Sequence, residues 1–254
     1  TDGLEVGFVK ESMPKDIFEN SVFRIQILLH NKGAYDIKNG YVALSYDESL
    51  LNIKGTEDLY FTTKSAKAED KQHIRLDIKG RSVRNPNGDT EIVTIRANSL
   101  EVNPEKELEP ANFYTTACYP YKTKASAEVC IDAHTYNEQL KRLEKPCEVK
   151  EISLSSQGSP VSVISIMPTM LPHESDNSLV VPQFIINIQN NGKGNVFGLE
   201  EGKDVPKQLC YNEIGIENIK DEIKVKAFFS GSGQRAPGQQ GIGLDCNTGI
   251  ILYI

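Results

Sequence analysis

Short segments with alternating apolar residues dominate the first half of the sequence and limit its possible folds more than any other feature. In the run 23–29, Phe23, Ile25, Ile27 and Leu29 occupy every second position. A period of two is the geometry of a β-strand with one buried face. The same alternation recurs in three further segments, 4–8, 74–78 and 93–97.

Turn signals separate these segments. The tripeptides Asn31-Lys32-Gly33 and Lys38-Asn39-Gly40 and the hairpin tip 85–89 carry the Asn, Gly and Pro residues that favour tight turns. Four more strands are expected at 41–46, 59–63, 113–122 and 127–132. Seven or eight short strands at regular spacing predict a sandwich of two sheets.

The segment 133–145 interrupts this pattern. Tyr136, Leu140 and Leu143 recur there at helical spacing among charges, as in a short helix or a polar connector. We therefore expect an all-β chain of two tandem immunoglobulin-like sandwiches, with the boundary near Pro146 and domains at 1–146 and 147–254. The second domain offers five strands, at 161–167, 179–189, 194–198, 223–229 and 249–254.

Five strands are fewer than the seven or so that close such a sandwich. The apolar C-terminal segment is expected to lie beside an open sheet edge, and we predict that it contacts another subunit through Ile250, Ile251, Leu252, Tyr253 and Ile254. A strand from a neighbouring subunit would complete the sheet by strand addition and generate a homopolymer. Two other readings stay open: a chain cut within its sheet, or further strands within 211–221 or 238–245.

Two segments carry a resemblance to a known family. FRIQILLHNKGAYDIKNGYVAL (23–44) looks like the second and third strands of the CARDB-type immunoglobulin-like repeats of archaeal cell-surface and S-layer-like proteins, and FIINIQNNGKGNVF (184–197) is similar. Segments 117–132 and 153–163 also resemble stretches found in surface proteins of small-genome archaea. The resemblance implies an immunoglobulin-like fold, an extracellular setting and a role in adhesion or architecture, without catalytic residues.

The five cysteines lack the spacing of a zinc site, so disulfides are the better explanation. Cys118 and Cys130 are expected to pair across a hairpin, and Cys210 and Cys246 within the second domain. The main rival joins Cys147 to Cys118 or Cys130. Otherwise Cys147 is left over, either free or bonded to another chain. Disulfides imply an oxidising compartment outside the cytoplasm.

Composition argues against several functions. A net charge of −7 without a basic cluster disfavours nucleic-acid binding, and no apolar run approaches the roughly 20 residues of a membrane span. Asn85, Asn87, Asp89 and Glu91 faintly resemble a calcium loop, but a plain hairpin tip needs no metal. The Gly- and Gln-rich stretch 230–243 lacks the ending of a phosphate loop and reads as a flexible loop, or as one that orders against a neighbour.

No grouping of a nucleophile with a base, or of paired carboxylates, stands out. We therefore predict no catalytic, cofactor-binding or metal-binding residues. The expected function is an extracellular structural subunit of a cell-surface filament or layer. The alternative is a monomeric adhesion or ligand-binding module of a larger surface protein, and a secreted enzyme of unrecognised type ranks third.

Overall fold

The computed structural model describes residues 3–132, 147–176, 179–198, 210, 223–230 and 249–253. These residues form an all-β protein in which every strand pair is antiparallel, with a 3₁₀ turn at Thr56–Asp58 and no α-helix. The chain divides into two compact units. Unit 1 comprises Thr1–Tyr121 and Asn195–Glu222, and unit 2 comprises Lys122–Gly194 and Ile223–Ile254.

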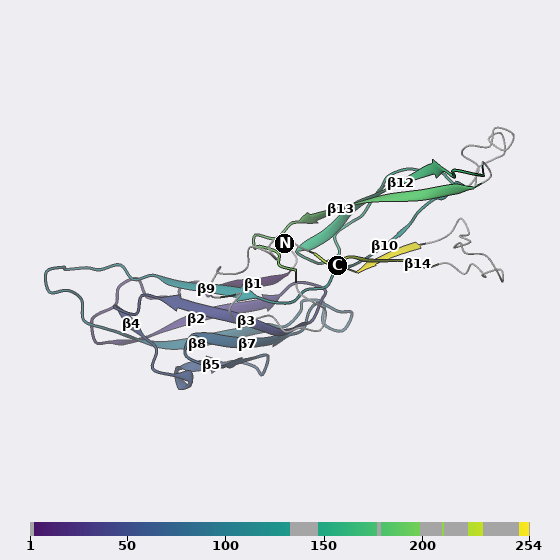
Figure 1. Cartoon of the computed structure of the whole chain (residues 1–254). Coiled ribbons are helices and arrows are strands. Elements are labelled where there is room, and N and C mark those ends of the chain that lie inside the picture. The colour runs from purple at the N-terminus through teal and green to yellow at the C-terminus, as the bar shows by residue number, and fades with distance from the viewer. Residues whose placement is uncertain are drawn as a thin grey trace. The chain divides into compact units, whose positions relative to one another are not determined.

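Unit 1 contains two sheets (Figure 1). The first has the order β1-β2-β8-β4, with β5 also paired to β8; its strands are β1 (Leu4–Phe8), β2 (Val22–Asn31), β4 (Leu51–Asn52), β5 (Leu59–Phe61) and β8 (Thr90–Ser99). The second has the order β6-β7-β3-β9, formed by β3 (Ile37–Tyr46), β6 (Ala66–Ala68), β7 (His73–Ile78) and β9 (Phe113–Cys118).

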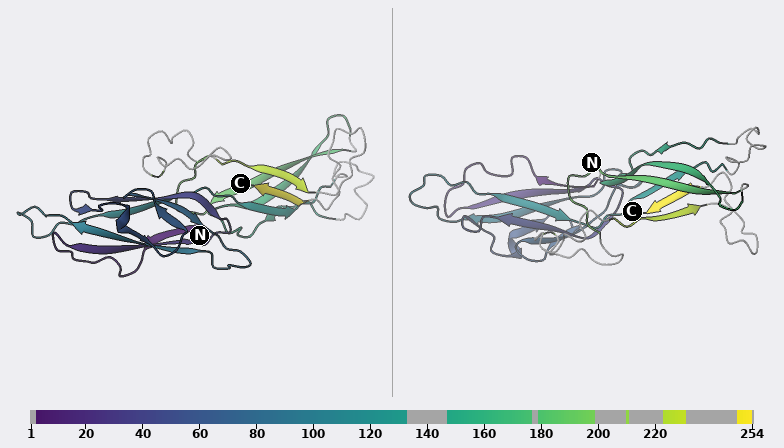
Figure 2. Two further views of the ribbon diagram at one scale, coloured as in Figure 1. Left: turned by 90° about the horizontal axis from the view of Figure 1, so that it is seen from below. Right: turned by 45° about the horizontal axis from the view of Figure 1, so that its top comes forward.

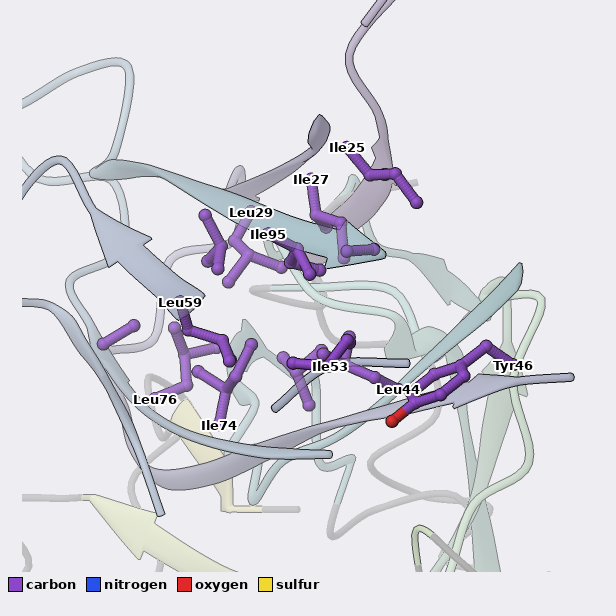
Figure 3. Close-up of a cluster of buried hydrophobic side chains, with 14 of the residues drawn as sticks. Ile25, Ile27, Leu29, Leu44, Tyr46, Ile53, Leu59, Ile74, Leu76 and Ile95 are labelled. Atoms are coloured by element: carbon purple, nitrogen blue, oxygen red, sulfur yellow. The ribbon is translucent and has the colours of Figure 1, made fainter. Parts of the chain in front are cut away.

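The alternating residues of the sequence build the core of unit 1. Ile25, Ile27 and Leu29 of β2 are at most 1 % exposed. Figure 3 shows them facing Leu44 and Ile74 across the space between the two sheets, which makes unit 1 a two-layer sandwich. Burial of such aliphatic side chains supplies about 1.5–3 kcal/mol each and is the main force that holds the layers together.

The tip between β7 and β8 confirms the predicted turn at 85–89. Gly88 has φ +74°, a conformation that favours glycine, and its N–H donates to the Asn85 carbonyl at 3.2 Å. A Cβ atom at Gly88 would collide with the backbone oxygen of Asn31. This turn therefore depends on glycine for two separate reasons.

Replacing Gly88 by alanine is expected to lower the free energy of unfolding by about 2 kcal/mol, because the left-handed backbone and the collision with Asn31 both penalise a side chain. Gly7 provides the matched control, since a Cβ atom there meets nothing within 4 Å. Gly7→Ala should change stability by less than about 1 kcal/mol. Urea unfolding of both variants checks this, and equal losses would contradict it.

Unit 2 also has two sheets among its described strands. One has the order β11-β12-β13, made of β11 (Ile152–Ser153), β12 (Val161–Pro172) and β13 (Val180–Asn190). The other has the order β10-β15-β14, made of β10 (Lys124–Glu128), β14 (Lys226–Ser230) and β15 (Gly249–Tyr253). Both views of Figure 2 show β12 and β13, in green, as long strands side by side.

The domain division differs from the expected single boundary near Pro146. The chain enters unit 2 already at Lys122, returns to unit 1 over 195–222 and enters unit 2 again at Ile223. The physical reason is strand pairing: β9 pairs with β3, whereas β10 pairs with β15. The expected hairpin between 113–122 and 127–132 is therefore wrong, and the expected helix or connector at 133–145 lies outside the described residues.

Two smaller expectations also change. Lys38-Asn39-Gly40 is no turn between strands but a bulge inside β3, where the register with β7 shifts between Ile37 and Gly40 and Asn39 has φ 55°. The segment 194–198 does not form one of the strands of unit 2. The proposed strands within 211–221 and 238–245 and the loop at 231–243 lie outside the described residues.

Candidate functional site

His73 and His30 are engaged in local structure of unit 1. The imidazole Nδ1 of His73 lies 2.7 Å from the Asp70 carboxylate, which also accepts the backbone N–H groups of Gln72 and His73. His30 contacts the Asn87 carbonyl through Nε2 at 2.8 Å. Each of these two rings thus fastens a turn of unit 1.

The four oxygen-bearing residues of the hairpin tip do not form one donor set. Asn85 donates to the Asp89 carboxylate at 2.6 Å, while the Glu91 carboxylate bonds to Thr62 and Thr63 instead. Within the described ranges there is no group of three or more His, Cys, Asp or Glu side chains placed to hold a metal ion.

Glu91 is a buried carboxylate that the sequence reading placed only in a loop. It belongs to the core-facing side of β8 and is 0 % exposed. Thr62 donates to it through its backbone N–H at 2.7 Å and its hydroxyl at 2.8 Å, and Thr63 through its N–H at 3.0 Å and its hydroxyl. These bonds hold Thr62 and Thr63, which directly follow β5, against β8.

The pKa of Glu91 reflects two opposing effects. Burial raises the pKa, whereas the hydrogen bonds from Thr63 and Thr62 lower it. The hydrogen bonds together outweigh burial, so the pKa lies below the ordinary value of 4.5. Glu91 is therefore a charged structural clamp at neutral pH. The sequence did carry a signal for this role, because Glu91 continues the alternation of Val93 and Ile95 at a core-facing position. The sequence analysis did not recognise it.

A surface hollow in unit 2 contains little that could react. It is lined by seven residues, Asp132, Cys147, Glu148, Val149, Pro168, Thr169 and Met170. The sulfur of Cys147 is already in a disulfide. The lining residues thus offer two carboxyl groups and one threonine hydroxyl, without a free thiol.

The cysteines pair differently from the main expectation. Cys118 is bonded to Cys210 and Cys130 to Cys147, with Cα–Cα distances of 5.6 and 5.8 Å. The Cys118–Cys130 pair is wrong because β9 and β10 enter different sheets, and Cys210 has no bond left for Cys246, which lies outside the described residues. The rival pairing of Cys147 with Cys130 is correct, so each unit carries one disulfide.

The C-terminal strand does not supply a free edge. Residues 249–253 form β15, which pairs with β10 on one side and with β14 on the other. The expected subunit contact through Ile250, Ile251, Leu252 and Tyr253 at an open edge is therefore wrong for these residues, because both backbone edges are already used. Ile254 lies outside the described residues.

The two units share one strand–turn module. In unit 1 the Asn31 side chain accepts from Gly33 N at 3.0 Å and donates to the Tyr35 carbonyl at 2.9 Å. In unit 2 the Asn190 side chain accepts from Gly192 N and donates to the Gly194 carbonyl, both at 2.9 Å. The offsets from the asparagine are the same, two and four residues.

The strand register of this module is also the same. Leu4, the first residue of β1, pairs with Asn31, and Val161, the first residue of β12, pairs with Asn190. In both units the residue after the asparagine donates its N–H to the residue before that first strand. Strands β12 and β13 of unit 2 therefore correspond to β1 and β2 of unit 1.

The two units differ at the edge of β2 and β13 that faces away from β1 and β12. In unit 1, β2 lies between β1 and β8, whereas β13 pairs with β12 alone among the described strands. The inward side chains of β2 are at most 9 % exposed, but the corresponding side chains of β13, Phe184, Ile186 and Ile188, stay only half-buried. Among the described strands, therefore, nothing takes the place beside β13 that β8 takes beside β2.

The opposite side of this sheet is uncharged and exposes several apolar side chains. Met167 faces Ile185 and Leu171 faces Val181 across the two strands, and these side chains, with Ile164, form what we call the outer face. Neither β12 nor β13 contains a charged residue, although 25 % of the chain is charged. Sequence reading missed this uncharged stretch, which was visible as the absence of Lys, Arg, Asp and Glu from 152–172.

No helix among the described residues is long and apolar enough to cross a membrane. Comparison of the chain with models of known protein families, with curated proteins and with solved structures finds no match.

Proposed function

We propose that this protein is a structural subunit that associates with further copies of itself into an extracellular filament or layer. The observation that carries the proposal is the sheet of β12 and β13, in which β13 pairs with β12 alone among the described strands and the outer face is uncharged and exposed. Sheets normally protect long edges with charge, proline or a covering segment. Strand β13 carries one proline, Pro182, but no charge over its eleven residues, and a strand of this kind can accept a neighbouring one.

The immunoglobulin-like assignment belongs to this proposal. The neighbours β1-β2-β8 and β7-β3-β9 are arranged like strands A-B-E and C′-C-F of such sandwiches, whereas β4 and β6 precede β7 in the chain and so differ from strands D and C″. The shared asparagine module supports a second, related sandwich in unit 2. Tandem sandwiches of this kind hold shape and present edges and faces to neighbours, which suits an architectural role.

The extracellular setting rests on the cysteines. Two disulfides, one in each unit, are compatible with an oxidising compartment, where such bonds persist. His30, His73, Glu91 and the four bonded cysteines have structural partners, so these groups give an enzymatic role no specific support.

The test is self-association of the unmodified chain. We expect its average mass in sedimentation equilibrium to rise with concentration, and electron microscopy of concentrated samples to show regular polymers or sheets. An oxidised protein that stays monomeric over the whole accessible range would refute the proposal and favour the adhesion module instead. Reduced protein is the control. If it stays folded, its assembly should match that of the oxidised protein, because the disulfides act only by stabilising the units.

A further inference from the structure

The outer face of unit 2 has an equivalent in unit 1, because the two units share the asparagine module. Asn190 corresponds to Asn31, so the remaining residues of β13 and β2 can be matched one by one. The residues of β13 on the outer face are Val181, Gln183, Ile185, Asn187 and Gln189, and they correspond to Val22, Arg24, Gln26, Leu28 and His30.

Charge distinguishes the two faces. In unit 1 the Lys32 ammonium lies 2.8 Å from the Glu5 carboxylate. At the equivalent positions of unit 2, Asn191 donates through Nδ2 to the Ser162 hydroxyl at 2.9 Å. The same backbone arrangement thus accepts an ion pair in unit 1 and a neutral hydrogen bond in unit 2. The fold therefore does not require the outer face to be uncharged, and another role must account for it.

The outer face has the composition of the centre of a protein interface. Cross-strand rows alternate along it, with a polar row between two apolar ones: Met167–Ile185, Thr169–Gln183 and Leu171–Val181. The four apolar side chains of these rows are 39–49 % exposed. Grouped exposed apolar side chains mark interaction sites, and interface centres are poor in charge and rich in methionine and apolar residues.

Two properties of the outer face favour a second copy of the chain as its partner. The amide and hydroxyl groups of Gln183 and Thr169 each donate and accept, so an identical face can supply matching groups, whereas a face of one charge would repel its copy. The chain carries a net charge of −7, so two copies repel each other in general. The charge-free strands β12 and β13 allow an approach without opposing like charges.

We infer that two copies of this chain pack outer face against outer face. A two-fold axis parallel to the strands, midway between β12 and β13, places each row over the same row of the second copy. Met167 then lies over Ile185 of the second copy, Leu171 over Val181, and Thr169 over Gln183. Apolar rows meet apolar rows and the polar row meets itself, in the aligned manner in which sheets pack face to face.

This inference rests on the proposed self-association and specifies one of its contacts. A two-fold contact is closed, so a filament or layer also needs a second, different contact. The two ideas can fail separately. A monomeric wild-type chain overturns both, whereas assembly that does not depend on the outer face overturns only the face-to-face contact.

The experiment compares Val181→Lys with Val22→Lys. These valines occupy equivalent positions in the two units and are 46 % and 54 % exposed. Both variants add one positive charge to a negative chain and so lower the general repulsion equally. Only Lys at 181 brings an ammonium group into the contact. We expect Val181→Lys to raise the dissociation constant of the dimer at least roughly fivefold and Val22→Lys to change it by less than about twofold.

A second pair of variants tests the middle of the contact. Ile185→Lys is expected to raise the dissociation constant at least roughly tenfold, because Ile185 lies in the central row, and Ile185→Met should stay within about twofold of wild type. Sedimentation measures the constants, and circular dichroism checks that each variant is folded. Equal effects of Val181→Lys and Val22→Lys, or a wild-type constant for Ile185→Lys, would overturn the inference.

Salt gives an independent readout. Added sodium chloride screens the repulsion between negative copies but leaves apolar contacts in place, so the dissociation constant of the wild-type dimer should fall as salt rises. A constant that rises with salt would indicate a contact made of ion pairs and overturn the inference. A photoreactive residue in place of Ile185 should link the copies through β12 or β13, and a link to unit 1 of the second copy would contradict it as well.

Discussion

Removal of the Cys118–Cys210 disulfide by a double serine substitution is expected to lower the free energy of unfolding of unit 1 by about 4 kcal/mol. The two cysteines are 92 residues apart in the chain, so the bond restricts the unfolded chain over a long loop. The entropy lost by closing a loop rises with the logarithm of its length, and about 4–5 kcal/mol is the upper end for natural disulfides. This is the largest single effect that we expect from any substitution in the chain.

The matched control is the double serine variant of Cys130 and Cys147. Their separation is 17 residues, for which the same treatment gives about 3 kcal/mol. The two variants should also act in different places. Hydrogen exchange in denaturant is expected to show lost protection in β3 and β9 for the first variant and in β12 for the second, because each bond lies within one unit.

Loss of protection in both units from either substitution would contradict this division of the chain. It would mean that unit 1 and unit 2 unfold as one body. Peptide mapping without reduction, done first, checks the pairing itself: a Cys118–Cys130 link would contradict the structure and restore the hairpin that the sequence suggested.

The disulfides also illustrate what sequence reading could and could not supply. Alternation located β1, β2, β7 and β8 closely, because the period of two is a property of neighbouring residues within each strand. The partner of a strand is not local. Residues 113–118 and 124–128 look like two arms of a hairpin, but β9 pairs with β3 and β10 with β15, which follows more than 100 residues later. The cysteine pairing then failed with the hairpin.

The subunit contact stays a prediction, and the place that the sequence suggested for it is wrong. A shortage of strands in the second half led us to expect an incomplete sheet there, and among the described strands β13 pairs with β12 alone. The expected open edge was assigned to the most apolar segment, 250–254, yet that segment lies between two other strands. Hydrophobicity favours the middle of a sheet, whereas the uncharged and moderately polar β13 lies at the edge.

Replacement of Glu91 by alanine is expected to destabilise unit 1 by about 3 kcal/mol. The carboxylate accepts two backbone N–H groups and two hydroxyl groups from Thr62 and Thr63 in a buried site, and its removal leaves these donors without their partner. Glu91→Gln keeps the shape and one acceptor oxygen, so about half of the loss is expected. Glu101→Gln, at an exposed position just after β8, is the control and should change stability by less than about 0.5 kcal/mol.

The pH dependence separates the charge of Glu91 from its packing. Its pKa in the folded chain lies below 4.5, so ionisation favours folding: the contribution is complete above 4.5 and is lost as the pH falls through the lowered pKa. The stability difference between wild type and Glu91→Gln should therefore be largest at neutral pH and shrink on acidification below 4.5. Urea unfolding across this range, followed by far-ultraviolet circular dichroism, measures it. A difference that stays constant through acidification would show that Glu91 acts by shape alone, and that the donors of Thr62 and Thr63 do not hold a charge in the core of the sandwich.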